Sequence, residues 1–430
     1  MKKLLKKVMP RRIISIYHWT LANLGALFYG YPSKKLIVIG VTGTKGKSTT
    51  SYLIAKFLES AGFKVGLTST IIFKIANREW LNDKKMTMLG RFELQKLLKD
   101  MVKAGCKYAI IETSSEGIVQ YRNLGIDYDI AVFTNLSPEH IESHGSYNRY
   151  KSAKGKLFKN LSYGRNKGVE KTAIINIDDV EADYFLQFKN KNIGFTLKDS
   201  YKKNLKEIIS IKKIDLDDKM SNFTINGVEL KTHLLGKFNI YNIASAISVC
   251  KVLGVSLEKL KKYILNIKQV PGRMEFIDEG QSFKVLVDYA HEPMSMKALY
   301  SIVREIYHKR VIHIFGSTGG GRDKSRRPIL GEIADQNANI IILTNDDPYT
   351  ENQAKIIAEV RAGIFKKKDG ENLFEIIDRK KAIEYGINLA QKDDIVLITG
   401  KGCEQVIAIG EEKLPWDDRE ITREALKIKK

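Results

Sequence analysis

Cysteine is scarce in this sequence of 430 residues. The three cysteines, Cys106, Cys250 and Cys403, lie far apart in the chain. This spacing provides neither the disulfide framework of a small secreted domain nor the paired thiolates of a zinc site. The scarcity therefore argues against a disulfide-stabilised scaffold and predicts a protein of a reducing compartment, the cytoplasm.

The sequence also lacks a clear membrane-spanning or secretory segment. Basic residues are concentrated over 2–12 and precede a mostly apolar stretch over 13–31, which is the outline of a signal sequence. Polar residues interrupt that stretch, no small-residue cleavage pattern follows it, and it is short for a membrane span. We therefore expect residues 1–35 to form a basic and apolar helical segment. It would pack on the protein or contact the membrane surface through residues 1–31.

Acidic residues are outnumbered. The chain has 50 Asp and Glu against 72 Lys and Arg, a formal net charge of +22 at pH 7. A field of this size suits a nucleic acid, an anionic membrane or a polyanionic small substrate. The basic residues are scattered, however, and no recognition helix, RNA-binding aromatic set or zinc finger accompanies them. We therefore expect no nucleic-acid partner.

Internal repeats and low-complexity segments are absent from the sequence. Apolar runs alternate with amphipathic stretches, which is typical of parallel sheets covered by helices. Residues 205–235 differ, because short alternating runs around Asn226-Gly227 predict a small antiparallel patch. A break at Pro271-Gly272 predicts a boundary between a central domain over 36–271 and a C-terminal domain over 272–430. The expected fold class is α/β, a P-loop ATPase domain with a mostly parallel sheet and that patch, followed by a Rossmann-like domain.

A glycine-rich loop over residues 40–50 is the strongest motif. A predicted strand enters it and a predicted helix leaves it, so backbone N–H groups would surround phosphate oxygens at a helix N-terminus. Lys47 would bridge the β- and γ-phosphates, and the Ser48 hydroxyl would hold Mg²⁺. The standard spacing is not met, because Val41 occupies the position of the first glycine. The motif predicts an ATP site.

Two further residues suit a metal ion. Glu112 closes the predicted strand over 108–112, and His140 follows the predicted strand over 130–135. A carboxylate and an imidazole at the ends of neighbouring parallel strands would both face a nucleotide-bound metal. Each residue alone is equally compatible with a structural role.

A lysine lies on the apolar face of a predicted helix over 147–161. At about 100° per residue, Lys154 falls in the middle of the face formed by aromatic and leucine side chains. A bare ammonium is costly to desolvate there unless it is paired. Three interpretations remain open: a ligand contact, a lysine converted to an anion by carbamylation, or a side chain whose ammonium reaches water.

Four loops of the C-terminal domain follow predicted strands. A glycine run with three arginines and a lysine over 316–327 is suited to an anion. Acidic residues over 345–349 and 400–404, and the segment 288–291, accompany it. Acidic groups beside a basic loop would suit a zwitterionic substrate.

Taken together, these motifs resemble the Mur ligase family, and specifically the MurE type, the UDP-N-acetylmuramoyl-dipeptide:amino acid ligases. The matching segments are, in order, residues 40–50, 112–115, 117–122, 134–140, 150–154, 235–239, 242, 272–275, 288–291, 321–324 and 400–404. The resemblance implies an ATP-dependent amide ligase of peptidoglycan precursor synthesis. It would join a free amino acid to a nucleotide-linked muramoyl-peptide, UDP-MurNAc-L-Ala-D-Glu, through an acyl phosphate. We expect a monomer.

The resemblance also implies roles for individual residues, with ATP, Mg²⁺ and a CO₂-derived carbamate as cofactors. The catalytic residues would be Lys47, Lys154, Glu112 and His140, and the metal ligands Ser48, Glu112, His140 and carbamylated Lys154. The ATP-binding residues would be Gly43, Thr44, Lys45, Gly46, Lys47, Ser48, Thr49, Asn239, Asn242, Arg273 and Asp288. The substrate-binding residues would be Thr87, Ser114, Ser115, Arg122, His291, Arg322, Asp346, Asp347, Gly400 and Glu404.

The sequence departs from the family pattern in four places. One is the substrate loop, where the family's Thr-Thr-Pro is reduced to Thr87-Met88-Leu89. The 39 residues before the loop are too few for the N-terminal domain that usually holds the uridine nucleotide, so we expect that domain to be absent. Glu116 stands where the family usually has histidine. In members that add diaminopimelate, an arginine occupies the position of Tyr349, and a tyrosine hydroxyl does not replace a bidentate arginine. We therefore expect lysine, or another basic or neutral amino acid, rather than meso-diaminopimelate.

Two other functions compete with this interpretation. A folylpolyglutamate or polyglutamate-type synthetase would share the ATP loop and the modified lysine. A P-loop ATPase that binds nucleic acid would use Lys47 and the positive charge, but it would not need the loops over 345–349 and 400–404.

Overall fold

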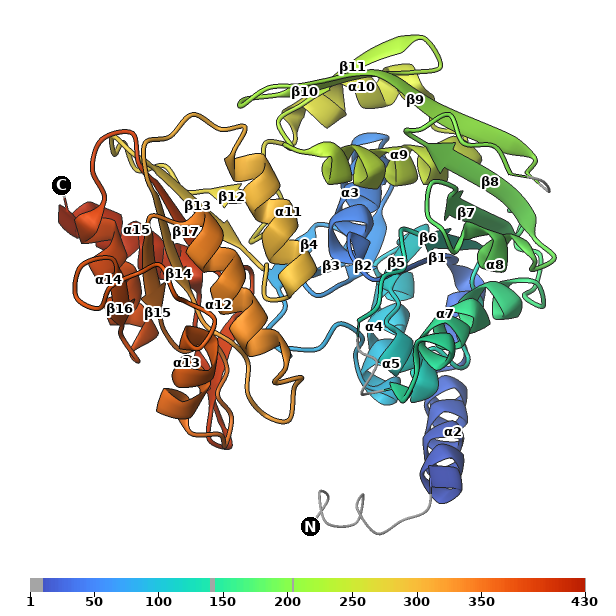
Figure 1. Ribbon diagram of the computed structural model, residues 1–430. Helices are drawn as coiled ribbons and strands as arrows, with labels where there is room; N and C mark the ends of the chain where they lie inside the picture. The colour runs from blue at the N-terminus through green and yellow to red at the C-terminus, as the bar shows by residue number, and fades with distance from the viewer. Residues whose placement is uncertain (1–10, 140–143, 203–204, 430) are drawn as a thin grey trace. The chain divides into compact units, whose positions relative to one another are not determined.

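The computed structural model describes residues 11–139, 144–202 and 205–429. Contacts divide the chain into two compact units (Figure 1). The first unit contains the chain up to Leu216 together with Ser221–Ile267, and the second contains Asp217–Met220 and the chain from Lys268 onward. All three cysteines are free and buried. None of the described helices is long and apolar enough to cross a membrane.

The first unit is built on an eleven-stranded sheet of order β11-β10-β9-β8-β7-β6-β1-β5-β2-β3-β4. The strands from β9 across to β2 in this order run parallel. Strands β5 and β7 are buried along their whole length, as expected for parallel strands covered on both faces. The bounds are β1 Ile37–Thr42, β2 Val65–Thr68, β3 Ile72–Ile75, β4 Arg78–Leu81, β5 Tyr108–Glu112, β6 Ile130–Phe133, β7 Thr172–Asn176, β8 Lys191–Thr196, β9 Glu207–Leu216, β10 Ser221–Ile225 and β11 Val228–Thr232.

Helices cover both faces of this sheet (Figure 1). Helices α3 (Lys47–Ser60) and α9 (Lys237–Val252) pack together on one face, with α10 (Leu257–Asn266) beside them. The other face is covered by α4 (Arg91–Lys103) and α7 (Tyr147–Leu161), whose apolar side chains join those of the sheet in one core. Three further helices belong to this unit: α2 Arg11–Phe28, α5 Ser115–Val119 and α8 Ala182–Leu186.

The predicted antiparallel patch is present and continues the main sheet. Strand β9 pairs parallel with β8 and antiparallel with β10, which forms a hairpin with β11. Asn226 and Gly227 connect the hairpin with φ of 50° and 81°, the left-handed conformation that a two-residue turn of this kind needs. At the opposite edge, β3 and β4 add a second antiparallel hairpin.

The second unit contains a six-stranded sheet of order β12-β13-β17-β14-β15-β16, parallel except for β12. Helices α14 and α15 pack on one face through the apolar core, and α11, α12 and α13 lie on the other (Figure 1). The α/β class predicted for both parts of the chain is therefore confirmed. The bounds are β12 Glu275–Phe276, β13 Lys284–Asp288, α11 Pro293–Val303, β14 Val311–Phe315, α12 Arg326–Asn337, β15 Ile340–Leu343, α13 Gln353–Arg361, β16 Leu373–Glu375, α14 Arg379–Leu389, β17 Ile395–Thr399 and α15 Asp418–Lys429, with a separate hairpin of β18 Val406–Ile409 and β19 Glu412–Pro415.

The loops predicted to carry chemistry follow the carboxyl ends of parallel strands in each unit. In the second unit these strands are β13, β17, β14 and β15, which are neighbours in the sheet. Strand β17 comes last in sequence but lies between β13 and β14. Such a reversal of strand order opens the loops on either side of it, and ligands of α/β proteins commonly bind there.

Candidate active site

The loop between β1 and α3 has the backbone of a phosphate-binding loop. Gly43 and Gly46 have φ of 152° and 79°. A Cβ on Gly43 would lie 1.9 Å from Thr134 Oγ1, and one on Gly46 would lie 2.3 Å from Asn242 Oδ1. Both positions therefore require glycine. Because α3 begins at Lys47, the N–H groups of its first turn lie at the end of the loop, where a helix N-terminus suits an anion.

Residues that follow β6 hold this loop in place. The Asn135 carbonyl accepts from Thr44 N at 2.8 Å, and Asn135 Oδ1 accepts from Lys45 N at 2.9 Å. Thr134 Oγ1 donates to the Lys45 carbonyl at 2.7 Å. The side chain of Lys47 folds back over the loop, with Nζ 2.9 Å from the Thr44 carbonyl oxygen. The loop is therefore shaped by the protein itself.

A serine and a carboxylate meet beside the loop. Ser48 Oγ donates to Glu112 Oε1 at 2.9 Å, and both residues are buried. The second oxygen, Glu112 Oε2, accepts from Thr70 N at 2.7 Å. Thr70 in turn donates from its hydroxyl to Thr87 Oγ1 at 3.1 Å. Thr49, the next residue of α3, is also buried. The structure thus connects the predicted substrate residue Thr87 with the predicted metal ligands.

The Ser48–Glu112 pair fits a nucleotide-bound Mg²⁺. Magnesium in such sites takes one or two protein oxygens and completes its shell with phosphate oxygens and water. Within the described ranges, no group of three or more His, Cys, Asp or Glu residues could hold a metal without such help. His140, the other predicted ligand, lies outside the described residues. Its neighbour Glu139 pairs with Lys45 at 2.7 Å.

Lys154 is buried on the inner side of α7, with 1% of its surface exposed. Its Nζ donates to the Gly43 carbonyl at 2.6 Å and lies 4.5 Å from the centre of the Tyr150 ring. The ammonium therefore does not reach solvent. Burial, and then the charge of Lys47, hold the pKa of Lys154 well below its usual value. Lys154 therefore loses its proton more readily than an exposed lysine does.

Two asparagines of α9 approach the same loop from the opposite face of the sheet. Asn242 Oδ1 accepts from Thr50 Oγ1 of α3 at 3.3 Å. Asn242 Nδ2 donates to Asn239 Oδ1 at 3.2 Å, and Asn239 Nδ2 donates to the Leu235 carbonyl at 2.8 Å. Since a Cβ on Gly46 would collide with Asn242, this pair lies directly against the glycine loop.

The residues predicted to contact the acceptor lie on and around α5. Ser114 caps this helix, its Oγ accepting from Gly117 N at 3.1 Å. Ser115 Oγ lies 3.1 Å from His144 Nε2. Arg122 donates to Gln120 Oε1 at 3.1 Å and to the carbonyl of Met88, the residue after Thr87. Sequence reasoning did not select His144, although a histidine near the predicted strand ends was a usable signal.

In the second unit, Lys401 is the centre of the acidic cluster. Its buried Nζ contacts both carboxylate oxygens of Asp347 at 3.0 Å and Glu404 Oε2 at 2.5 Å. Burial by itself lowers the pKa of Lys401, but Glu404 and Asp347 together raise it above its usual value. Asp347 also accepts from Ala408 N at 2.7 Å. Lys401 was absent from the predicted site residues, although it lies in a Gly-Lys-Gly run after a strand.

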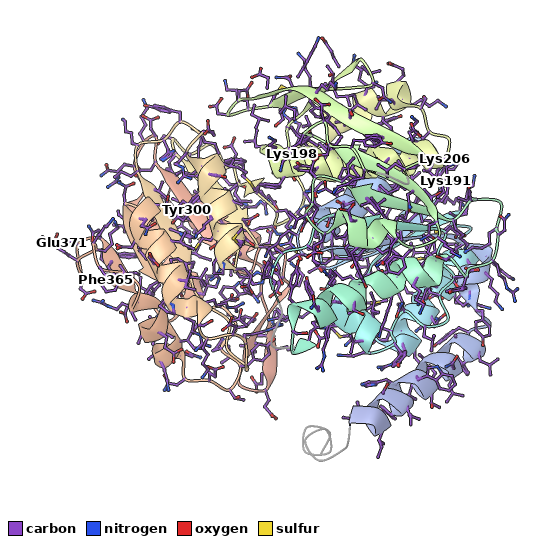
Figure 2. The ribbon with its side chains drawn as sticks, turned by 45° about the vertical axis from the view of Figure 1, so that its right-hand side comes forward. Lys191, Lys198, Lys206, Tyr300, Phe365 and Glu371 are labelled. Atoms are coloured by element: carbon purple, nitrogen blue, oxygen red, sulfur yellow. The ribbon has the colours of Figure 1, made fainter. Side chains whose placement is uncertain are left out.

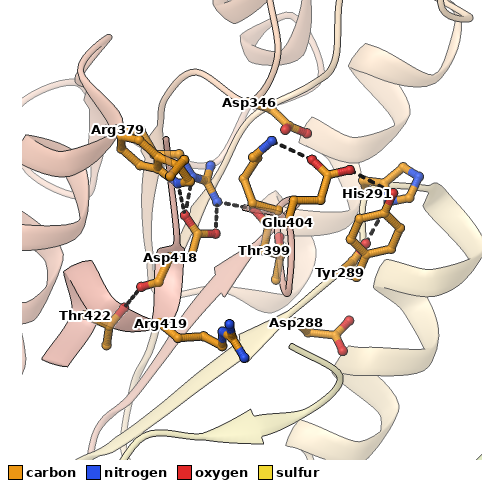
Figure 3. A network of polar contacts seen from close by, with 12 residues as sticks. Asp288, Tyr289, His291, Asp346, Arg379, Thr399, Glu404, Asp418, Arg419 and Thr422 are labelled. Atoms are coloured by element: carbon orange, nitrogen blue, oxygen red, sulfur yellow. Dashed lines mark hydrogen bonds and ion pairs between the residues drawn. The ribbon is translucent and has the colours of Figure 1, made fainter. Parts of the chain in front are cut away.

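Asp346, the neighbour of Asp347, forms its hydrogen bond with a hydroxyl group. Its Oδ2 accepts from Thr318 Oγ1 at 3.1 Å, and a Cβ on Gly400 would lie 3.1 Å from the same oxygen. Burial, and next the charge of Asp347, raise the pKa of Asp346 to about 6. The carboxylate of Asp346, which Figure 3 shows near Glu404, therefore gains a proton as the pH falls through about 6.

Tyr349 packs over the glycine run that follows β14. It adopts φ of 50°, and a Cβ on Gly320 would lie 2.6 Å from its ring. Its backbone N–H donates to the Ala408 carbonyl at 3.0 Å, and its carbonyl accepts from Gly410 N at 2.7 Å. Burial raises the pKa of Tyr349. The charge of Arg322, at the exposed end of the glycine run, lowers this pKa by a smaller amount. The glycine loop and the acidic loop thus lie against each other within this unit.

The residues after β13 form the other side of this cluster. Tyr289 donates from its hydroxyl to Glu404 Oε1 at 3.1 Å, and its ring packs against His291, as Figure 3 shows. The guanidinium of Arg273 lies 4.0 Å from the Tyr289 ring centre. Asp288 accepts from Met274 N at 2.7 Å, and its pKa is raised by burial against the lowering effect of Arg273.

A buried ion pair supports the strand ends below the cluster. Arg379 donates to both oxygens of Asp418, at 2.8 and 2.7 Å (Figure 3). It also donates to the Asn345 carbonyl at 3.0 Å, two residues after β15, and to the Thr399 carbonyl at 2.8 Å, at the end of β17. Nothing local in the sequence marks Arg379, because its partners come from three distant segments.

Comparison with known proteins agrees with this geometry. The family models of the Mur ligase middle domain and of the Mur ligase glutamate ligase domain match residues 41–250 and 272–402. A UDP-N-acetylmuramyl-tripeptide synthetase of Roseiflexus sp. (strain RS-1) is 37% identical, covering 94% of this chain and 81% of that protein. A UDP-N-acetylmuramoyl-L-alanyl-D-glutamate--2,6-diaminopimelate ligase of Geobacillus thermodenitrificans (strain NG80-2) is 35% identical, covering 95% and 82%.

A solved structure points the same way. A UDP-N-acetylmuramoyl-L-alanyl-D-glutamate--2,6-diaminopimelate ligase of known structure is 31% identical and superposes with a TM-score of 0.61, covering 91% of this chain and 78% of that one. The chain therefore belongs to the Mur ligase family, and the predicted resemblance is confirmed. It is an ATP-dependent ligase that forms amide bonds.

Proposed function

We propose that this protein adds an amino acid to UDP-N-acetylmuramoyl-L-alanyl-D-glutamate in peptidoglycan precursor synthesis, in the cytoplasm. The single observation that carries the proposal is the Ser48–Glu112 pair beside a preformed phosphate-binding loop. Its support is the 37% identity to a tripeptide synthetase across 94% of the chain. Buried, free cysteines suit the compartment.

The reaction requires two displacements. A carboxylate oxygen of the acceptor attacks the γ-phosphorus of ATP, and ADP leaves. The amine of the amino acid then attacks the acyl carbon, the C–O bond to phosphate breaks, phosphate leaves, and the nitrogen loses a proton. The N–H groups of residues 43–48 would bind the phosphate oxygens, and Lys47 would offset the charge on the transferred group.

Ser48 and Glu112 would hold Mg²⁺, which when bound neutralises phosphate charge. Their oxygens are 2.9 Å apart and face the loop, so one ion bound to nucleotide phosphate would contact both. Thr70 keeps the Glu112 carboxylate in place through its backbone N–H. We retain His140 as a predicted ligand of a metal at the same strand ends.

Lys154 would act as a carbamate. Its neutral amine would add to the carbon of CO₂ and lose a proton, which converts a buried cation into an anion with two oxygen ligands. Burial and the neighbouring Lys47 favour the neutral amine that this addition needs. The carbamate would in turn be stabilised by Lys47 and by a metal ion, which explains an ionisable residue on an apolar helix face.

The remaining predicted contacts are distributed over both units. We propose Asn239 and Asn242 as nucleotide contacts within the first unit, and we retain Arg273 and Asp288 as predicted nucleotide-binding residues. Ser114, Ser115 and Arg122 would contact the muramoyl-peptide. Their support in the first unit is position: the asparagines lie against the glycine loop, and Arg122 lies against the residue after Thr87.

The second unit would bind the incoming amino acid and would favour lysine or another basic or neutral one. The ammonium of Lys401 binds the carboxylate of Asp347 and one oxygen of Glu404. We therefore propose that the carboxylate of Asp346 binds the side-chain amine of the amino acid. Arg322 would bind the α-carboxylate. Tyr349 offers no guanidinium to a second carboxylate. In this selectivity the chain would differ from the Geobacillus relative, which is named for diaminopimelate.

The test is ATP turnover by the whole protein. Phosphate release should require both the muramoyl-dipeptide and an amino acid, and mass spectrometry should show the amide product. Lys47→Ala should reduce turnover at least about 100-fold, the loss typical of one electrostatic donor, while the exposed control Lys64→Ala should not. Turnover stimulated by DNA or RNA without an amide, or glutamate addition to a folate, would refute the proposal.

A further inference from the structure

Helix α2 exposes an apolar face. Residues 13–28 contain no charged side chain. Among the described residues, 22 large hydrophobic side chains are exposed, and seven of them are on this one helix. They are Ile13, Ile16, Tyr17, Trp19, Leu24, Leu27 and Phe28. At about 100° per residue, all but Trp19 fall within an arc of about 120°. The face is therefore one continuous stripe rather than scattered residues.

The opposite face of α2 is already packed. Ala22, Gly25 and Ala26 are buried, and the helix lies along α4. A Cβ on Gly125 would lie 2.4 Å from the Cβ of Ala26, which shows how closely the helix approaches the body of the first unit. Ser15 Oγ donates to the Tyr121 hydroxyl at 3.1 Å. The helix therefore has a defined inner face, and the apolar stripe is its outer one.

The chain after α2 anchors the helix further. Ser33 Oγ donates to the Gly125 carbonyl at 3.2 Å. Lys167 Nζ donates to the carbonyls of Ser33 and Leu36, at 3.0 and 2.7 Å. In Figures 1 and 2 the helix lies at the periphery of the first unit and extends beyond it. Whatever the stripe binds would thus be held at a fixed orientation to this unit.

Charge indicates what covers the stripe. The first twelve residues contain Lys2, Lys3, Lys6, Lys7, Arg11 and Arg12 and no acidic residue. Lys34 and Lys35 follow the helix, and the whole chain has a net charge of +22. An uncharged apolar face next to a cationic segment is typical of helices that lie in the interface of a membrane with anionic lipids. A second copy of the chain would bring the same cations together and repel.

We propose that α2 is an interfacial membrane anchor, which lies on an anionic bilayer with Ile16, Leu24 and Leu27 in contact with the acyl chains. Lys34 and Lys35, which follow the helix, would contact lipid phosphates. This inference does not depend on the ligase reaction, since it concerns a surface that no predicted site residue shares.

Vesicle binding of the full-length protein tests the proposal. Co-sedimentation is measured with vesicles of phosphatidylcholine alone and of phosphatidylcholine with phosphatidylglycerol in equal parts. We expect binding to the second kind, weakened by salt. Ile16→Glu/Leu27→Glu should reduce the partition coefficient at least about tenfold, because two apolar side chains leave the interface. Both positions are 63% exposed, so folding should not change.

A matched control separates insertion from net charge. Phe365→Glu/Ile428→Glu changes two side chains of the second unit that are 81% and 78% exposed. It carries the same charge change and should bind vesicles as the unchanged protein does. ATP turnover with soluble substrates should be equal in all three proteins. Equal vesicle binding by both variants, or binding independent of phosphatidylglycerol, would overturn the proposal. So would a dimer in sedimentation velocity that only Ile16→Glu/Leu27→Glu abolishes.

Discussion

Replacing Lys154 with methionine should separate activity from stability. Lys154→Met keeps the apolar stem and removes the amine. It loses the hydrogen bond to the Gly43 carbonyl, worth about 1 kcal/mol, but it also removes an ionisable group from a site with 1% exposure. The two effects oppose each other, so the free energy of unfolding should change by less than about 1.5 kcal/mol. Turnover should fall at least about 100-fold, because the proposed carbamate, and with it a ligand of the metal ion that neutralises phosphate charge, is lost.

The assays are urea unfolding, steady-state turnover and direct detection of the carbamate. With ¹³C-labelled bicarbonate, the unchanged protein should show one labelled carbamate that Lys154→Met lacks. Because burial and Lys47 lower the pKa of Lys154, labelling should persist below the usual lysine range and decline as the pH falls through the lowered pKa. Lys156→Met, an exposed position of the same helix, is the control.

Rescue distinguishes a missing anion from a packing defect. Lys154→Ala leaves space beside the Gly43 carbonyl, and acetate should restore part of its turnover, whereas chloride should not. Unimpaired turnover of Lys154→Met, together with no ¹³C label in the unchanged protein, would refute the carbamate. A loss of stability above about 3 kcal/mol would instead show that the amine is structural.

Three further predictions concern the second unit. The kcat/KM for lysine should exceed the kcat/KM for meso-diaminopimelate at least about tenfold, because one charged hydrogen bond contributes roughly 1.5–3 kcal/mol. The variant Tyr349→Arg should reduce this ratio, whereas Tyr349→Gln should not. Equal kcat/KM values for the two amino acids in the unchanged protein would contradict the assignment. Because the pKa of Asp346 is raised to about 6, its carboxylate gains a proton as the pH falls through that value. The KM for lysine should therefore rise between pH 7 and pH 5, and Asp346→Asn should abolish that rise. Arg379→Met should cost about 3–5 kcal/mol of unfolding free energy, because it leaves Asp418 buried without its partner. Arg379→Met/Asp418→Leu should recover much of that loss in urea unfolding, and no recovery would mean that the carbonyl contacts of Arg379 dominate.

Much of the fold could be predicted because its signals are local. Helix α7 spans Tyr147–Leu161 and strand β5 spans Tyr108–Glu112, both as their periodicity indicated. Asn226 and Gly227 form the predicted hairpin turn, since only residues that tolerate positive φ suit it. The ATP loop was equally readable, because its glycines, lysine and serine all lie within residues 40–48. A run of adjacent residues is enough for such features.

The antiparallel edge at β3 and β4 was harder. Strands β2, β3 and β4 have four residues each and none shows an alternation of buried and exposed positions, so their pairing was not anticipated. The attachment of β9 to β8 also was not visible, because register and neighbours depend on the whole sheet.

The sequence by itself determined the family, the α/β class and the residue types available for chemistry. Only the tertiary structure decided which of them meet. Asp347 was predicted to bind substrate, and in the fold its carboxylate pairs with the ammonium of Lys401, 54 positions away in the sequence. Arg379 connects Asp418 with two strand ends, and Lys154 reaches the carbonyl of Gly43. Each of these contacts joins two groups that are far apart in the chain. The energy of such a contact depends on the burial of the two groups and on the distance between them, and both are set only when the chain folds.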